Sequence, residues 1–277
     1  MIHALDHIAV AVRDLEAAAK AYEALLGRAA GMREEAGGAA RIWFQLSNMA
    51  LELIAPTGPG AAGERVDARL DAAGEGLWIL AFAADDIPAT QRTLERRGVP
   101  SRLTDVRTQR ALVADTDATH GVTIAVVEQT SQRPPQPSPP IGNEAAALRA
   151  LDHVVIHTPN PDRAMALYGA RLGLNLRLDR TNAEWGSRLL FFRCGGLTVE
   201  IGHSLKAGVS DGPDRLGGMA WRAADPAAAQ ARIAAAGLDV SELRKGRKPG
   251  TEVFTVRSGV PGAPSLVISA APAETQA

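Results

Sequence analysis

Short apolar runs and amphipathic segments alternate along the chain in a pattern that recurs four times. In each copy a strand-like run leads to an Asp or Asn, then to a helical segment, and then to a glycine. The short polar side chain can accept a hydrogen bond from the first helical N–H groups, and glycine allows a left-handed exit. The four pairs of capping residue and closing glycine are Asp14 and Gly27, Asp86 and Gly98, Asn160 and Gly173, and Asp225 and Gly237.

Two β-rich segments follow each predicted helix, separated by glycine and polar residues that suit hairpin turns. These segments are residues 40–46 and 49–54, 111–115 and 123–128, 189–193 and 197–201, and 252–257 and 265–269. The pattern predicts an α+β protein built from four βαβββ repeats. A sheet with one helix on its outer face leaves the other face open, so two repeats can enclose a cavity for a ligand.

The two halves of the chain also repeat each other. Leu5-Asp6-His7-Ile8-Ala9-Val10 returns as Leu151-Asp152-His153-Val154-Val155-Ile156. Between the halves, residues 131–140 contain five prolines, which favour an extended linker over a helix or sheet. We therefore predict two domains, at residues 1–130 and 148–272, each with two repeats and joined by a linker at 131–147.

Composition narrows the class of protein. Apolar residues make up 46% and charged residues 22% of the chain, which is ordinary for a globular protein. The formal net charge of −1 argues against a nucleic-acid partner. A single cysteine, Cys194, an N-terminus without a signal-peptide pattern and the lack of a long apolar run favour a cytoplasmic protein with no membrane partner.

These motifs resemble the vicinal oxygen chelate superfamily, which includes glyoxalase I, methylmalonyl-CoA epimerase, extradiol dioxygenases and bleomycin-resistance proteins. The two Leu-Asp-His runs carry the resemblance, together with Leu51-Glu52-Leu53 and Val199-Glu200-Ile201. Residues 51–87 resemble the epimerase in particular. The resemblance implies two glyoxalase-like domains with cup-shaped sheets and a small-molecule ligand.

In that superfamily a divalent metal is held by an opening-strand residue and a late-strand carboxylate from each of two paired repeats. The resemblance keeps these positions as His7 with Glu52 and as His153 with Glu200. The equivalent positions in the second and fourth repeats carry no ligand: they are Ile79, Ala125, Gly218 and Val267. We therefore expect no cofactor or a weakly bound divalent metal. A complete set of four ligands arises only if the first and third repeats share a cavity.

The same four residues are candidates for acid–base chemistry. Glu52 and Glu200 have apolar neighbours, and an unpaired buried carboxylate is costly, so each is expected to pair with the histidine of its own repeat. Such a pair fits a structural role and an acid–base role equally well. His153 and Glu200 are our first choice for catalysis, and His7 and Glu52 are the second.

Four further residues are candidates for substrate binding. Trp43 and Trp185 are placed to stack on a planar ligand at a cavity mouth. His157 follows His153 by two strand periods and is expected on the same face. Arg247 belongs to a basic run at 244–250 that suits capture of an anionic group.

Three functions remain open from the sequence. The first is a metal-poor glyoxalase-like protein that binds, isomerises or cleaves a small organic molecule. The second is a metal-dependent lyase, isomerase or dioxygenase of glyoxalase type. The third is a non-catalytic protein that sequesters a drug or metabolite. The oligomeric state is also open, and a homodimer is one of the alternatives.

Overall fold

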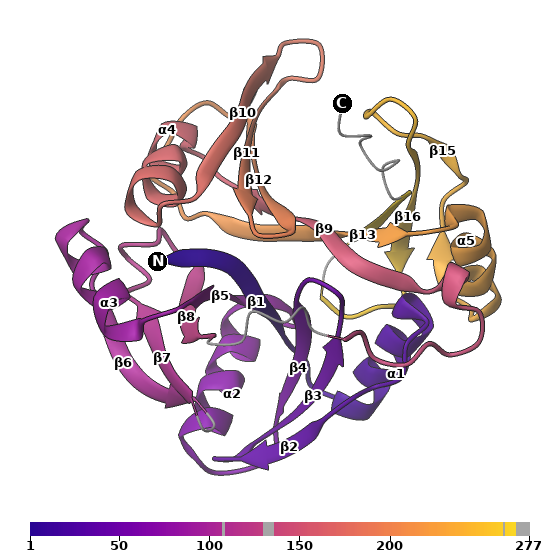
Figure 1. Ribbon diagram of the computed structural model, residues 1–277, viewed down its shortest axis with the longest axis horizontal. Coiled ribbons are helices and arrows are strands. Elements are labelled where there is room, and N and C mark those ends of the chain that lie inside the picture. The colour runs from indigo at the N-terminus through magenta and orange to yellow at the C-terminus, as the bar shows by residue number, and fades with distance from the viewer. Residues whose placement is uncertain (107–108, 130–135, 263, 270–277) are drawn as a thin grey trace. The chain divides into compact units, whose positions relative to one another are not determined.

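Figure 1 shows a computed structural model of the chain, which describes residues 1–106, 109–129, 136–262 and 264–269. Strands of the first half are β1 (Ile2–Ala11), β2 (Arg33–Ala36), β3 (Ala39–Gln45), β4 (Ala50–Pro56), β5 (Gly76–Ala84), β6 (Ser101–Val106), β7 (Gln109–Ala114) and β8 (Thr123–Glu128). Strands of the second half are β9 (Leu148–His157), β10 (Asn175–Asn182), β11 (Ser187–Cys194), β12 (Leu197–Ser204), β13 (Arg215–Ala223), β14 (Asp239–Val240), β15 (Arg244–Lys245), β16 (Glu252–Ser258) and β17 (Ser265–Ser269).

These strands form two mixed sheets. The first has the order β2-β3-β4-β1-β5-β8-β7-β6, and the second has the order β10-β11-β12-β9-β13-β17-β16-β14, with β15 paired to β16. Each repeat contributes an opening strand, a helix and a run of antiparallel strands, and the opening strands β5 and β9 pair in parallel with β8 and β12. The predicted α+β class and the four βαβββ repeats are confirmed.

The helices are α1 (Leu15–Leu26), α2 (Ala61–Ala73), α3 (Ile87–Arg96), α4 (Pro161–Met165) and α5 (Pro226–Ala235). The predicted caps form as expected. Asp14, Asp86 and Asp225 each accept a hydrogen bond from the backbone N–H three residues ahead, at 2.8–2.9 Å, and Asn160 does so at 3.1 Å. The third repeat differs from the expected regular helix, because α4 continues as a π-helical turn over Ala166–Arg171. The helix α2, between the first two repeats, was not predicted.

The described chain divides into two compact units. Compact unit 1 comprises Met1–Ala9, Trp78–Pro134 and His153–Gly217, and contains most of the second and third repeats. Compact unit 2 comprises Val10–Leu77, Pro135–Asp152 and Gly218–Ala277, and contains most of the first and fourth repeats. The domain boundaries at 130 and 148 remain a prediction.

Each unit buries a tyrosine from a helical segment against a phenylalanine of a strand. In compact unit 2 the rings of Tyr22 and Phe44 lie 6.3 Å apart, and in compact unit 1 the rings of Tyr168 and Phe192 lie 6.2 Å apart. All four side chains are fully buried. Because side chains alternate along a strand, the neighbours of each phenylalanine face away from the helix. This alternation decides which residues line the open face of the sheet.

The second part of the predicted linker is packed against the first repeat, within compact unit 2. The Ser138 N–H donates to the Gln45 carbonyl at 2.8 Å, and the Gln45 N–H donates to the Ser138 hydroxyl at 3.0 Å. A buried arginine, Arg28, donates to the carbonyls of Ser138 and Leu148 at 2.8 and 2.6 Å. Residues 131–135, which belong to the predicted linker, lie outside the described part of the chain.

No helix within the described residues is both long enough and apolar enough to cross a membrane.

Candidate functional site

The predicted site residues fall into both compact units. His7, His153, His157, Trp185 and Glu200 belong to compact unit 1. Trp43, Glu52 and Arg247 belong to compact unit 2. The contacts of each group are described separately below.

The third repeat brings His153 and Glu200 together, as its sequence predicts. His153 lies on β9 and Glu200 on the parallel neighbour β12, where Val155 is in register with Glu200. The Nε2 atom of His153 is 3.6 Å from Oε2 of Glu200, and the two side chains are 17% and 19% exposed. They are thus half-buried rather than buried, so a ligand can reach them while part of their solvent is excluded.

The local strand pattern explains this placement. Val154, Ile156, Val199 and Ile201 are fully buried, so the residues between them face away from the helix of the repeat. On the adjacent strand β11, Phe191 is in register with Glu200. Because Phe192 packs on Tyr168, the half-buried Phe191 shares the open face with the acid–base pair.

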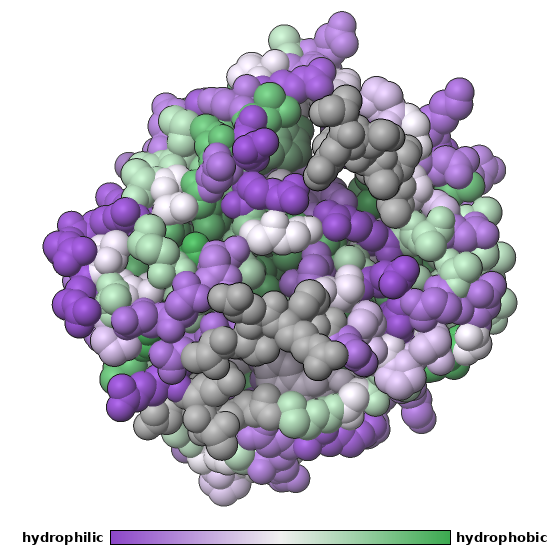
Figure 2. Space-filling view, in the orientation of Figure 1, coloured by the Kyte–Doolittle hydropathy of each residue, from purple (hydrophilic) through white to green (hydrophobic). Residues whose placement is uncertain are grey.

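Apolar surface surrounds this pair. Leu189, two residues before Phe191, is also half-buried and in register with Gly202. On the face shown in Figure 2, apolar side chains gather over β10, β11 and β12, and Leu176 and Leu178 of β10 are exposed. The open face therefore offers one imidazole and one carboxylate next to apolar wall residues.

His157 lies at the end of β9 in register with Gly202, and its side chain is exposed. It lines a cavity of about 400 Å³ together with residues of the loop that follows β12. Trp185 lies in the turn between β10 and β11, where it is 42% exposed and the Arg180 guanidinium lies 5.1 Å from its ring centre. Neither contact tests the predicted role in substrate binding.

In the first repeat the equivalent residues have different neighbours. The Nδ1 atom of His7 is 2.7 Å from Oδ1 of the adjacent Asp6. Glu52 lies on β4, and its Oε1 is 3.0 Å from Nε of Arg41 on β3, with both side chains largely buried. The expected pairing of His7 with Glu52 joins residues of different compact units and stays a prediction. The sequence analysis did not identify Arg41. The available signal was strand alternation, because Arg41 precedes Trp43 by two residues and Trp43 is in register with Glu52.

Arg247 and Cys194 lie where the structure gives little support for a role in a site. Arg247 is exposed in the turn that follows β15. Cys194 is buried at the end of β11, and burial raises the pKa of its thiol to about 12. A buried thiol with a raised pKa is a weak nucleophile near neutral pH.

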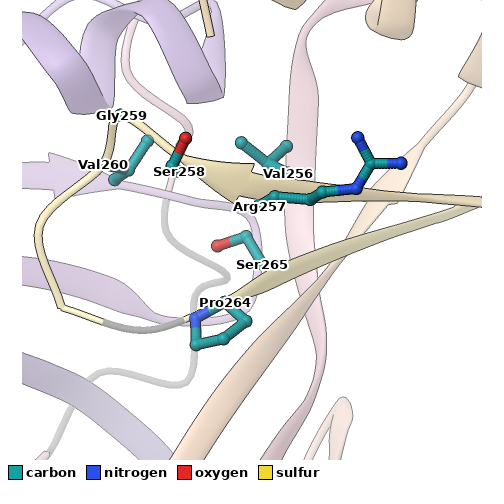
Figure 3. Close-up of a pocket in the computed structure, with 7 residues that line it drawn as sticks. All are labelled: Val256, Arg257, Ser258, Gly259, Val260, Pro264 and Ser265. Carbon is teal, nitrogen blue, oxygen red and sulfur yellow. The ribbon is translucent and has the colours of Figure 1, made fainter. Parts of the chain in front are cut away.

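The structure describes two further cavities. One of about 320 Å³ lies between the end of β16 and the start of β17, and Figure 3 shows its lining from Val256 to Val260 with Pro264 and Ser265. Its Ser265 hydroxyl accepts a hydrogen bond from the buried Trp221 indole at 3.2 Å, and Arg257 pairs with Asp239. Another, of about 420 Å³, lies beside β6 and β7. None of the predicted site residues lines either cavity.

The described residues offer few side chains that could hold a metal ion together. Within the described ranges, no group of three or more His, Cys, Asp or Glu side chains is arranged to hold a metal ion. In addition, the Glu52 carboxylate lies against the cationic Arg41. Transition metals in proteins usually have three or more protein ligands, so the donors described here do not fit a tightly held metal.

Comparisons with known proteins give the same fold. Residues 5–139 match the glyoxalase-like domain family. A mutant of 4-hydroxymandelate synthase from Streptomyces coelicolor superimposes with a TM-score of 0.71 at 13% identity, covering 97% of this chain and 92% of that one. A Mn(II)-bound glyoxalase from Novosphingobium aromaticivorans gives 0.67 at 16% identity, covering 97% and 82%.

A variant of methylmalonyl-CoA epimerase from Streptomyces coelicolor is similar to half of the chain, with 23% identity, a TM-score of 0.42 and coverage of 47% of this chain and 100% of that one. No protein among the curated sequences matches the chain significantly.

Proposed function

Because the chain contains a glyoxalase-like domain and has the fold of two-domain vicinal oxygen chelate proteins, we propose that it acts on a small organic molecule held on the open face of β9, β11 and β12. In this proposal His153 and Glu200 move a proton to or from the ligand, in the manner of an isomerase or lyase. The observation that carries the proposal is the 3.6 Å separation of the imidazole and the carboxylate on this face.

The two side chains have complementary roles. The imidazole Nε2 of His153 can take a proton from a ligand and return it. When the imidazole is protonated, the Glu200 carboxylate stabilises the positive charge at short range. Phe191 and Val155 on the same face would exclude water from one side of an organic ligand. The pair is thus suited to abstracting a proton next to a carbonyl group.

The proposed chemistry uses no tightly held metal. Among the described residues no group of three or more candidate ligands is found, and the equivalent carboxylate of the first repeat contacts Arg41. Elemental analysis of protein purified without chelator tests this directly. One equivalent of Zn, Ni, Fe or Mn that depends on both His7 and His153 would instead favour a metal-dependent enzyme.

The acid–base role is tested by deuterium exchange. The chain is incubated in D₂O with a panel of small carbonyl acids and thioesters, and exchange of carbon-bound protons is followed by mass spectrometry. Glu200→Gln and His153→Gln should each slow exchange by at least about 100-fold, the usual contribution of a general acid or base.

His3 and Asp85 provide a matched control. They also form a histidine–carboxylate contact in compact unit 1, at 3.3 Å, but the side chains are 38% and 74% exposed. His3→Gln should leave the exchange rate unchanged. A ligand that raises the melting temperature but shows no exchange above background would contradict catalysis and favour a binding protein.

A further inference from the structure

The cavity of about 400 Å³ at the carboxyl ends of β9 and β12 lies beyond the His153–Glu200 pair and has polar chemistry of its own. Its described lining residues are His157, Thr158, Pro159, Gly202, His203, Ser204, Ala207, Gly212, Pro213 and Arg215. The volume is at the lower end of the range for small-molecule sites. All these residues belong to compact unit 1.

His203 presents a fixed hydrogen-bond acceptor to this cavity. Its side chain is buried, and Nδ1 lies 3.1 Å from the backbone carbonyl of Thr158. A carbonyl oxygen can only accept, so Nδ1 carries the proton and donates it. In the neutral imidazole Nε2 is then an acceptor. Among the described residues nothing donates to Nε2, which leaves it available for a ligand O–H or N–H.

A buried carboxylate holds another part of the cavity lining in place. The side chain of Asp214 is fully buried, and its Oδ1 accepts hydrogen bonds from the Thr158 hydroxyl at 2.7 Å and from Arg163 at 3.0 Å. Arg163 also donates to the carbonyls of Asp211 and Gly212, at 3.1 and 2.6 Å. These bonds fix the segment 211–215 before any ligand binds. A pre-organised wall lowers the entropic cost of binding.

The charge of the lining favours an anion. Arg215 follows Asp214 on the cavity wall, is exposed, and makes no ion pair within the described part of the chain. His157 is a second group that can carry positive charge, and none of the described lining residues is Asp or Glu. A guanidinium suits carboxylate and phosphate groups because it can donate two parallel hydrogen bonds.

We propose that this cavity is a binding site for a small organic anion that also carries a hydroxyl group. Arg215 binds the carboxylate or phosphate, and His203 Nε2 accepts a hydrogen bond from the hydroxyl. The site is separate from the proposed acid–base pair, and its test does not require turnover.

Binding to the full chain is measured by isothermal titration calorimetry with a matched set of three-carbon probes. Lactate carries both groups, propionate lacks the hydroxyl, and propane-1,2-diol lacks the anion. Glycerol 3-phosphate distinguishes a phosphate ligand from a carboxylate. Lactate or glycerol 3-phosphate should saturate the site, propionate should bind at least about fivefold more weakly than lactate, and the diol should not bind. Equal affinity for lactate and propionate, or saturation by none of the probes, overturns the proposal.

Three variants assign the contacts. Arg215→Gln should weaken the hydroxy anion about tenfold or more, whereas Arg177→Gln, an exposed arginine on β10, should not. His203→Gln should lower the affinity for lactate to that for propionate. An equal loss in Arg177→Gln and Arg215→Gln would indicate non-specific charge attraction and would refute the site.

The wild-type protein gives a test that does not depend on folding of the His203 variant. Long-range ¹H–¹⁵N spectra of the imidazole rings report which nitrogen carries the proton. The His203 signals should show a protonated Nδ1, and lactate should shift the Nε2 resonance more than propionate does. A protonated Nε2 in the free neutral ring would contradict the proposed hydrogen bond.

Discussion

Replacing Arg28 with methionine is expected to lower the free energy of unfolding by about 3–5 kcal/mol, because it removes two charge-assisted hydrogen bonds to buried carbonyls, each worth about 1.5–3 kcal/mol. The Arg28 side chain is 1% exposed, and its Nη2 lies 2.7 Å from Oε1 of Glu144. It also donates to the backbone carbonyls of Ser138 and Leu148. Methionine preserves much of the volume but leaves the buried carbonyls of Ser138 and Leu148 without this donor, whereas the half-exposed Glu144 carboxylate keeps water and Arg149.

Arg149 provides a matched control because it contacts the same carboxylate. Its Nε lies 3.5 Å from Oε1 of Glu144, but its side chain is 57% exposed. Solvent-exposed ion pairs contribute about 0–1 kcal/mol, so Arg149→Met should cost no more than that. The comparison separates loss of a buried donor from loss of charge beside Glu144.

Urea unfolding is followed by circular dichroism and by tryptophan fluorescence. With an m-value of about 3 kcal/mol/M, the midpoint of Arg28→Met should fall by about 1 M or more, and that of Arg149→Met by less than about 0.3 M. Equal midpoints for the two variants would show that the buried hydrogen bonds of Arg28 contribute nothing beyond a surface charge.

Three further predictions concern the site and the helices. Leu189→Arg should place a guanidinium next to Glu200 and slow proton exchange about tenfold or more, whereas Leu103→Arg, at an exposed position on the edge strand β6, should not; equal rates in both variants would contradict this. Cys194 should resist alkylation at pH 8 in the native state, because burial raises the pKa of its thiol to about 12, and fast native alkylation would contradict this. Because the folded state holds the thiol protonated, the contribution of Cys194 to stability should be lost as the pH rises from 9.0 toward 12. Asp14→Ala should cost about 1 kcal/mol in urea unfolding, and Asp14→Asn much less.

The sequence predicted the buried elements of the fold better than the exposed ones. The capped helices and the inner strands of each repeat follow from apolar periodicity and capping residues. The strands β2 and β10 were not assigned, because most of their side chains are exposed and lack alternation. The helix α2 was also missed, since its buried positions are only Gly63, Val66 and Leu70 and its other residues are alanines and charged residues.

Long-range side-chain partners were harder to predict than strands. The pair of His153 and Glu200 was expected from the repeat, because both positions lie on adjacent strands. The bond between Asp152 and Arg222, at 2.8 Å, joins residues 70 positions apart and has no local signal. The strand pattern gives His203 no place beside Glu200, because the two residues are an odd number of positions apart on one strand. A pocket at the end of that strand depends on the loop that follows, which periodicity does not describe.

The two Leu-Asp-His repeats differ at one position beside the glutamate, where the first repeat has Arg41 and the third has Leu189. On β3, Arg41 is in register with the residue two positions after Glu52, and on β11, Leu189 is in register with the residue two positions after Glu200. The arginine therefore reaches Glu52 in the first repeat, whereas the leucine leaves Glu200 beside His153. A carboxylate engaged by a largely buried guanidinium has fewer lone pairs free to accept a proton from a ligand. For this reason the acid–base role is assigned to the third repeat, although the first repeat retains the same histidine and glutamate.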